Sequence, residues 1–298
     1  MNDMAANLKG VIPALAVSLT AQGSIDHELV RRQISYLVRG GIHGLFVNGT
    51  TGEGAVLTTA EKLEILQLVK SSVDENTVVC AVSIQPSTAA ALAEIRQFQS
   101  VSPDFVAVTT PYYYALSQEA IIEHFETIAD ASPIPLILYN IPQNTHNAMA
   151  ADTIARLAEH PNIVGIKDSS GDFEAFNQVV YSVGSAGFTC LQGSDVLAAA
   201  SFLAGAAGIV TGLGNARIEP YIDLHRAACA DDRPGMKSAQ MRIYAMTKII
   251  DASGGKGISA IKAVMECQNR GRRTMKLPYM AVNDTEFDKI RSVIDGLD

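Results

Sequence analysis

A lysine at the end of a short apolar stretch is the residue of this sequence whose type and position best suit covalent chemistry. Lys167 closes the stretch 163–167, which has the length and β-branched content of a buried strand. Burial disfavours the charged form of a lysine amine, and a neutral amine is a nucleophile that can form a Schiff base with a ketone. On this stretch alone, a lysine that extends to the surface or pairs with Asp168 is the more common case. The other strand ends of the chain therefore have to decide between the two interpretations.

Apolar stretches typical of parallel strands alternate with helical patterns along most of the chain. The expected strands are residues 11–19, 44–49, 78–83, 105–110, 135–140, 163–168, 189–193 and 208–213. The expected helices include residues 26–39, 59–73, 88–99, 118–131, 151–159, 173–183 and 196–204. Thr58 and Glu61 predict a capping box at the start of the second of these helices.

This alternation predicts an α/β fold in which each strand is followed by a helix. Parallel βα units of this kind close most simply into a (β/α)8 TIM barrel, with a doubly wound sheet as the alternative. We assign residues 1–230 to the barrel that carries the active site and residues 231–298 to a C-terminal helical extension packed on the barrel. Periodic apolar positions at 241–250 and 258–265 predict helices in this extension, and the arginine-rich residues 270–273 predict a surface turn.

The carboxyl ends of the strands would bring several polar side chains to one mouth of the barrel, where the active sites of this fold lie. The second strand leads into the loop 48–54, whose glycines and adjacent Thr50 and Thr51 suit a carboxylate-binding nest, although a tight turn is the simpler interpretation. The fourth strand leads to Tyr113 within a run of tyrosines, which are usually packing or interface residues, and the fifth ends at Tyr139. The convergence of an amine, phenols and this loop favours the reactive interpretation of the lysine.

This combination supports carbon–carbon bond chemistry without a metal or a cofactor. A tyrosine hydroxyl near the amine can relay the proton that expels water from the carbinolamine, and the protonated imine then stabilises an enamine at the neighbouring carbon. The sequence contains no glycine-rich nucleotide motif, Walker loop or HExxH zinc motif, and its six histidines form no cluster along the chain. We therefore expect neither a bound cofactor nor a metal.

Composition and charge argue against several other classes of protein. The net charge of −8 argues against nucleic-acid binding, and no apolar stretch approaches the roughly 20 residues that cross a bilayer. The N-terminal segment carries Asp3 and lacks the apolar core of a secretory signal. The four cysteines are scattered without metal-binding spacing, which predicts reduced thiols in a cytoplasmic protein.

Four motifs make the chain resemble the dihydrodipicolinate synthase / N-acetylneuraminate lyase family of class I, Schiff-base aldolases. They are GLFVNGTTGE at 44–53, TTPYYY at 109–114, LYNIP at 138–142 and GIKDSSGD at 165–172, in the order and spacing of the family. The match covers essentially the whole barrel. The resemblance implies a 2-oxo acid such as pyruvate as the substrate.

The resemblance also implies a role for each residue at the mouth. Lys167 would be the Schiff-base lysine, and Tyr139 would be the general acid/base that also contacts the 2-oxo acid. Thr50 and Thr51 would hold the pyruvyl carboxylate, with Thr50 linking Tyr139 toward Tyr113. In members where such a tyrosine matters, it comes from a neighbouring subunit, so Tyr113 implies a homotetramer or a homodimer.

The resemblance leaves the second half of the substrate open. Gly193 and Val210 match positions that line the pocket by backbone or apolar contact. Members that make dihydrodipicolinate carry an arginine where this chain has Asn144. A neutral amide cannot replace a guanidinium, which offers a carboxylate a positive charge and two parallel hydrogen bonds. His146 replaces a glycine usual in the family, and Val196 stands where sialic acid lyases place an acidic residue.

We therefore expect a class I aldolase or lyase that forms a Schiff base with pyruvate or another 2-oxo acid. The leading hypothesis is reversible aldol cleavage of a 4-hydroxy-2-oxo acid or a 2-keto-3-deoxy sugar acid. Dihydrodipicolinate synthase activity (4-hydroxy-tetrahydrodipicolinate synthase) is the second hypothesis, and a dehydratase that uses the same imine is the third. A non-catalytic sensor of 2-oxo acids is the alternative from a different class of protein, and neither nucleic acid nor a membrane is an expected partner.

Overall fold

Eight parallel strands form one sheet that curves into a barrel in the computed structural model, which describes residues 8–183 and 187–297. The strands are β1 (Gly10–Pro13), β2 (Gly44–Val47), β3 (Val78–Ser83), β4 (Phe105–Thr109), β5 (Leu136–Asn140), β6 (Ile163–Asp168), β7 (Thr189–Gln192) and β8 (Gly208–Thr211). Their order is β1-β8-β7-β6-β5-β4-β3-β2, and a bridge between Ala14 and Phe46 joins the two ends of the sheet. The predicted (β/α)8 TIM barrel is confirmed, and the doubly wound alternative is wrong.

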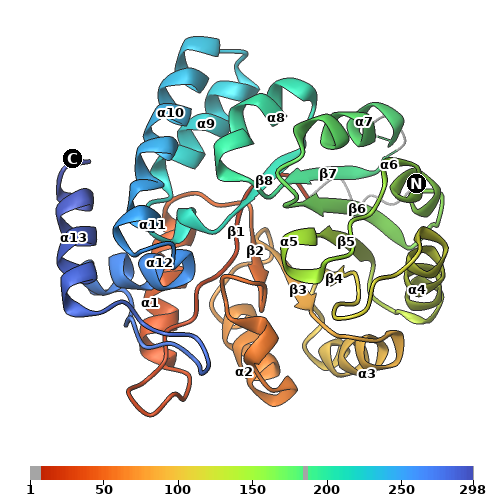
Figure 1. The fold of residues 1–298 in the computed structure, drawn as a ribbon, viewed down its shortest axis with the longest axis horizontal. Helices are drawn as coiled ribbons and strands as arrows, with labels where there is room; N and C mark the ends of the chain where they lie inside the picture. The colour runs from red at the N-terminus through yellow and green to blue at the C-terminus, as the bar shows by residue number, and fades with distance from the viewer. Residues whose placement is uncertain (1–7, 184–186, 298) are drawn as a thin grey trace.

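A ring of helices surrounds the strands, because each βα unit returns the chain along the outside of the barrel (Figure 1). These helices are α1 (His27–Arg39), α2 (Thr59–Lys70), α3 (Thr88–Phe98), α4 (Gln118–Ala131), α6 (Ala151–Leu157), α7 (Phe173–Val183), α8 (Ala198–Ala204) and α9 (Glu219–Cys229). The predicted capping box of α2 is present, with Thr58 and Glu61 each accepting a hydrogen bond from the other's backbone N–H. Within the described residues, no helix combines the length and apolar character needed to cross a membrane.

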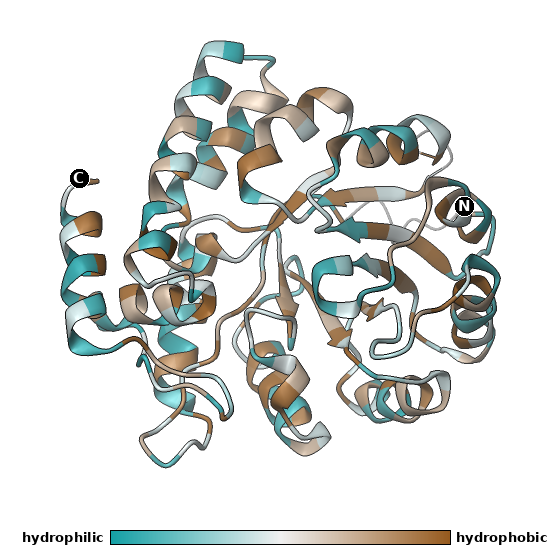
Figure 2. Ribbon diagram, viewed as in Figure 1, coloured by the Kyte–Doolittle hydropathy of each residue, from teal (hydrophilic) through white to brown (hydrophobic). Residues whose placement is uncertain are grey.

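Apolar side chains cover both faces of the strands, which explains why the strands appear in the sequence as nearly continuous apolar stretches. One set, including Phe46 and Val210, packs inside the barrel, and another, including Leu45 and Ile166, packs under the helices. In Figure 2 the central strands are largely brown, whereas the surrounding helices alternate between brown and teal. Only the strand ends are therefore open to polar chemistry.

The C-terminal residues add helices on the outside of the barrel. They are α10 (Arg233–Met246), α11 (Lys248–Ala252), α12 (Gly257–Cys267) and α13 (Asp284–Asp295). The helix predicted at 258–265 is confirmed, the stretch 241–250 is helical but divided at Thr247 between α10 and α11, and α13 was not expected from the sequence. The division into residues 1–230 and 231–298 stays a prediction. Residues 1–7, on which the predicted absence of a secretory signal rests in part, lie outside the described residues.

The surface turn predicted at 270–273 is wrong at its first two residues, because Arg270 is partly buried and Gly271 is buried. The Arg270 guanidinium lies 3.6 Å from the centroid of the Tyr36 ring and donates to the backbone oxygens of Asn215 and Ala216 at 3.0 and 2.9 Å. An arginine can cover apolar surface with its stem while its planar head stacks on an aromatic ring. Arg270 therefore fastens the C-terminal segment to α1 and to the turn after β8.

Candidate active site

An irregularity in the pairing of β5 with β6 turns Lys167 toward the barrel interior. The register shifts by one residue between positions 136 and 137 of β5, so β6 carries one extra residue there. Val164 packs inside the barrel, and strict alternation from it would place Lys167 on the outer face. Past the extra residue, Ile166 packs outward under the helices, and Lys167 faces inward beside Tyr139, its partner in register on β5.

The amine of Lys167 lies between two aromatic rings. Lys167 is only 4% exposed, and its Nζ lies 4.1 Å from the centroid of the Tyr139 ring and 4.4 Å from that of Phe46. Among the described residues no carboxylate pairs with it, and Asp168 instead accepts a hydrogen bond from Asn140 at 2.7 Å. Both structural interpretations of the lysine, extension to the surface and pairing with Asp168, are therefore wrong.

The Tyr139 hydroxyl links this lysine to the loop after β2. Tyr139 is 1% exposed, and its hydroxyl lies 3.2 Å from Oγ1 of Thr50. The loop is so tight that a Cβ atom on Gly54 would lie 1.8 Å from the backbone oxygen of Asn48, which requires glycine at position 54. No hydrogen bond within the described residues uses the backbone N–H of Thr50 or Thr51, so the loop presents free donors as well as hydroxyls.

Glu53, in the same loop, joins it to the C-terminal helices. Its Oε1 lies 2.6 Å from Nζ of Lys262 on α12, and its Oε2 accepts the backbone N–H of Lys276 at 2.7 Å. Both members of the ion pair are buried; burial lowers the pKa of Lys262, and the negative charge of Glu53 opposes that shift. This pair was not predicted from the sequence, although a lysine among the apolar positions of a helix is an indication of a buried ion pair.

Tyr113 lies on the surface of the chain, apart from the buried Tyr139. It is 81% exposed, and its backbone φ of +84° is a conformation that costs a non-glycine residue about 1–3 kcal/mol. Asn147 holds this loop, because its side-chain amide donates to the backbone oxygens of Pro111 and Tyr114, both at 2.8 Å. A fixed loop thus presents the Tyr113 ring outward, and a single chain does not bring it to the lysine.

The chain matches one protein family along nearly its whole length. The model of the dihydrodipicolinate synthetase family matches residues 7–296. The chain belongs to this family. Its members are lyases, so the chain is an enzyme of that class.

Curated relatives and solved structures agree with this family. The 4-hydroxy-tetrahydrodipicolinate synthase of Neisseria meningitidis serogroup B (strain ATCC BAA-335 / MC58) is 32% identical over 289 residues, which cover 96% of this chain and 98% of the relative. The enzyme of the same name from Moorella thermoacetica (strain ATCC 39073 / JCM 9320) is 31% identical, covering 95% of this chain and 96% of the relative. The structure of dihydrodipicolinate synthase from Bacteroides thetaiotaomicron superposes with a TM-score of 0.92 at 29% identity, covering 97% of this chain and 98% of that one.

A cavity of about 400 Å³ opens over the threonine loop of this family member. Its lining residues are Thr50, Glu53, Ala55, Ile84, Thr109, Tyr112, Ile141, Asn144, Thr145 and Tyr279. Asn144, on the short helix α5 (Pro142–Thr145), is exposed at this cavity, and His146 caps the same helix with φ +59°. Among the described residues no lysine or arginine lines the cavity, and the carboxylate of Glu53 is already paired with Lys262.

Two further predicted residues lie at or within the barrel wall. The backbone N–H of Gly193 donates to the backbone oxygen of Asp168 at 2.6 Å, and a Cβ atom on Gly193 would lie 2.0 Å from Oγ of Ser169. Gly193 therefore has no free amide for a substrate and can offer only its carbonyl oxygen. Val210 is buried inside the barrel, where it can make only apolar contact.

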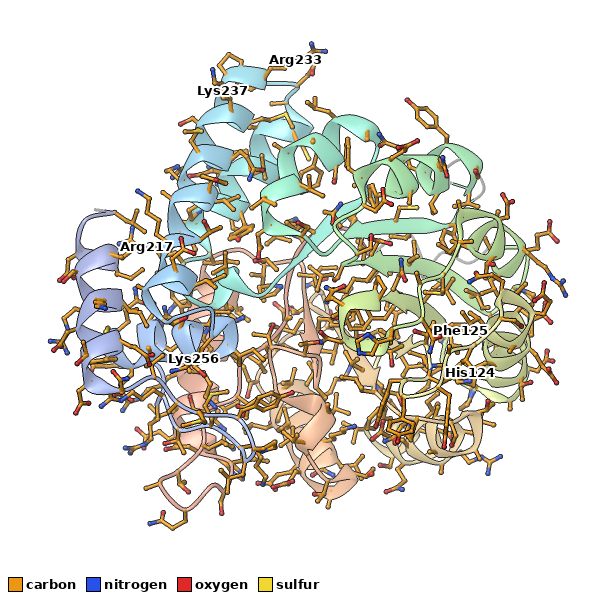
Figure 3. The ribbon with its side chains drawn as sticks, viewed as in Figure 1. His124, Phe125, Arg217, Arg233, Lys237 and Lys256 are labelled. Carbon is orange, nitrogen blue, oxygen red and sulfur yellow. The ribbon has the colours of Figure 1, made fainter. Side chains whose placement is uncertain are left out.

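Two other features of the chain, a buried histidine and a groove, involve the outer helices. Burial lowers the pKa of His124 on α4 to about 4, and Figure 3 shows His124 and Phe125 on the outer helices. A groove of about 1060 Å³ between α10 and the end of α13 is lined in part by Arg217 and Lys237, which lie on the opposite side of Figure 3 from His124. Within residues 8–183 and 187–297, no group of three His, Cys, Asp or Glu side chains could hold a metal ion.

Proposed function

We propose that this chain is a Schiff-base aldolase that cleaves or forms a carbon–carbon bond next to a 2-oxo acid. The observation that carries the proposal is the position of Lys167: a buried amine without an acidic partner among the described residues, in register with Tyr139. The Tyr139 hydroxyl in turn contacts Thr50. An amine so placed is suited to attack the carbonyl carbon of a 2-oxo acid.

The proposed reaction uses Tyr139 as its acid and base. The Lys167 amine adds to the C2 carbonyl, and the Tyr139 hydroxyl gives its proton to the carbinolamine oxygen, which leaves as water. The Tyr139 oxygen then takes the proton of the substrate 4-hydroxyl, and the C3–C4 electrons pass into the protonated imine as the aldehyde departs. Tyr139 returns the proton to C3 of the enamine, and water then hydrolyses the protonated imine, which releases the 2-oxo acid and the neutral Lys167 amine and gives the remaining proton back to the Tyr139 oxygen.

The threonine loop is the proposed holder of the substrate carboxylate. The hydroxyl and backbone N–H of Thr51, together with the N–H of Thr50, would donate to the carboxylate oxygens. The Thr50 hydroxyl, 3.2 Å from that of Tyr139, would pass protons toward Tyr113 of a neighbouring subunit. The exposure and fixed backbone of Tyr113 support an assembly of two or four subunits, because the hydroxyl then has a place to act.

The lining of the cavity favours aldol cleavage of a 4-hydroxy-2-oxo acid or a 2-keto-3-deoxy sugar acid. Hydroxyl, amide and apolar groups suit an uncharged, hydroxylated aldehyde portion. The second candidate is 4-hydroxy-tetrahydrodipicolinate synthase activity, which the names of the relatives favour. Asn144 counts against it, because no cationic side chain in the described part of the chain lines the cavity to bind a second carboxylate.

Borohydride reduction in the presence of pyruvate tests the Schiff base. The wild type should gain the mass of one reduced pyruvyl group for each chain, and Lys167→Arg should gain none. A panel of hydroxy-oxo acids, assayed for pyruvate release beside the condensation reaction, then separates the two candidates. A wild type that forms no adduct with pyruvate or any other 2-oxo acid would rule the proposal out.

A further inference from the structure

The C-terminal segment touches the proposed carboxylate site at one buried residue. Glu53 lies three residues after Thr50 and adopts a left-handed backbone conformation with φ +59°. Its backbone N–H donates to the Thr50 oxygen at 3.0 Å, so a displacement of Glu53 moves the threonine turn with it. Each of its two carboxylate oxygens is bound by a different part of the C-terminal segment.

The first of these contacts is a charge pair in the interior. Nζ of Lys262 lies 2.6 Å from Oε1 of Glu53, and the side chains are 0% and 2% exposed. Leaving either charge without its partner at this depth is unfavourable, so the pair constrains where the loop can lie. The helix that carries Lys262, α12, is itself buried along most of its length, which makes it a rigid support.

The second contact leads to the wall of the cavity. Oε2 of Glu53 accepts the backbone N–H of Lys276 at 2.7 Å, and the Lys276 ammonium pairs with Glu61 on α2. Three residues further along, Tyr279 donates its own N–H back to the Lys276 oxygen and lines the cavity. In Figure 1 this connection between α12 and α13 extends as a blue loop toward the α2 side of the barrel.

We propose that Glu53 is a positioning residue that couples the carboxylate-binding turn at Thr50 and Thr51 to the Tyr279 wall of the aldehyde subsite. This inference rests on the proposed function, because it takes the turn at Thr50 and Thr51 as the site of the substrate carboxylate and the cavity beside Tyr279 as the site of the aldehyde portion. Tyr279 is then a specificity residue: it is 40% exposed and closes the cavity from a segment outside the barrel. The C-terminal segment is thereby part of the active site as well as a cover for the helices.

The test compares Glu53→Gln, Lys262→Met and the double variant with the wild type. Each single variant should raise the pyruvate concentration that half-saturates borohydride trapping by about tenfold, because small misplacements of binding groups are costly. The double variant removes both buried charges, so it should recover much of the thermal stability lost by the single variants. Its half-saturating pyruvate concentration should stay raised, since the fixed contact between loop and helix is gone.

A second buried pair provides the matched control. Lys62 on α2 and Glu94 on α3 lie 2.7 Å apart with both side chains 2% exposed, and neither lines the cavity. Lys62→Met and Glu94→Gln should lower thermal stability as much as the Glu53 variants do, without moving the half-saturating pyruvate concentration. Equal shifts in both sets of variants, or a double variant that recovers pyruvate binding together with stability, would show Glu53 to be only structural and overturn the inference.

Tyr279→Ala tests the other half of the coupling in a variant that alters no buried charge. It should leave pyruvate trapping near the wild-type value and change the ratio of kcat/KM between short and long hydroxy-oxo acids by about tenfold. An unchanged ratio would remove Tyr279 from the subsite and overturn the coupling. A wild type that traps no 2-oxo acid fails the proposed function itself, whereas trapping that is indifferent to Glu53 fails only this inference.

Discussion

Lys167 and Tyr139 are direct neighbours in register on β6 and β5, and the Lys167 amine lies 4.1 Å from the centroid of the Tyr139 ring. The ring therefore supports the amine, while the hydroxyl points onward to Thr50 at 3.2 Å. These two contacts of one tyrosine can be separated by mutation, because phenylalanine keeps the ring and loses only the hydroxyl.

Tyr139→Phe should lower kcat for aldol cleavage by about 10²- to 10⁴-fold, the usual contribution of a positioned acid or base. The free energy of unfolding should change by only about 1 kcal/mol, since one hydrogen bond is lost and the packing stays. Steady-state kinetics and chemical denaturation measure the two effects. Thr50→Val is the matched variant, because it removes the other hydroxyl of the same contact. Activity within a few-fold of the wild type for Tyr139→Phe would contradict the assigned role.

The elements that position these residues were largely predictable from the sequence. Strands β3 and β6 and helices α4 and α7 begin and end where the apolar patterns predict. Buried parallel strands are continuous apolar stretches, and amphipathic helices repeat with a different period, so local sequence suffices for both. The tight turn around Thr50 was also predictable from local sequence, because its glycines indicate a turn and the structure requires glycine at position 54.

The direction in which Lys167 points could not be predicted in this way. A strand of six residues without a bulge and one with a bulge have the same composition, and the choice depends on the pairing with β5. The pair of Glu53 and Lys262 joins residues 209 positions apart, which no local pattern reveals. Helix α13 was not predicted for a related reason: it packs on α11 and α12, and this tertiary contact is not visible in the local sequence.

A subunit-mixing experiment tests whether Tyr113 acts in a neighbouring chain. Tyr113→Phe and Lys167→Arg should each be strongly impaired alone. Co-expressed, they form hybrid dimers in which one of two sites combines an intact lysine with an intact tyrosine. Random pairing should then restore about a quarter of the wild-type sites. If Tyr113 served its own chain, the mixture would show no more activity than the mean of the two variants.

Replacing Asn144 with arginine should shift the preference for the second substrate. Asn144 is exposed on α5 at the edge of the cavity, so a longer side chain has room there. A guanidinium offers a carboxylate two parallel hydrogen bonds. Asn144→Arg should therefore raise kcat/KM for condensation with a carboxylate-bearing aldehyde by about tenfold, with Asn144→Gln as the uncharged control. Equal effects of the two variants would show that charge at this position does not select the substrate.

His124 predicts a pH dependence of stability that is independent of the active site. It is 5% exposed on α4, its Nδ1 lies 2.9 Å from Oγ1 of Thr88, and its Nε2 is buried without a partner among the described residues. Burial lowers its pKa to about 4 from an ordinary 6.5, so the unfolded chain binds the proton more readily. The stability that the neutral side chain contributes is fully present above pH 6.5 and is lost as the pH falls toward 4.

The size of this effect follows from the shift. The lowered pKa of His124 corresponds to a loss of about 3 kcal/mol in the free energy of unfolding between neutral pH and the acidic end of that window. Denaturant titrations of the wild type and His124→Gln at several pH values between 4 and 7 measure it. The variant should be less stable than the wild type near neutral pH, because it loses ring packing, but its stability should fall less steeply as the pH is lowered. Parallel pH profiles for the two proteins would show that His124 is not the group responsible. Activity at neutral pH should be unchanged in the folded variant, since His124 lies on the outer helix α4 (Figure 3) and does not line the cavity.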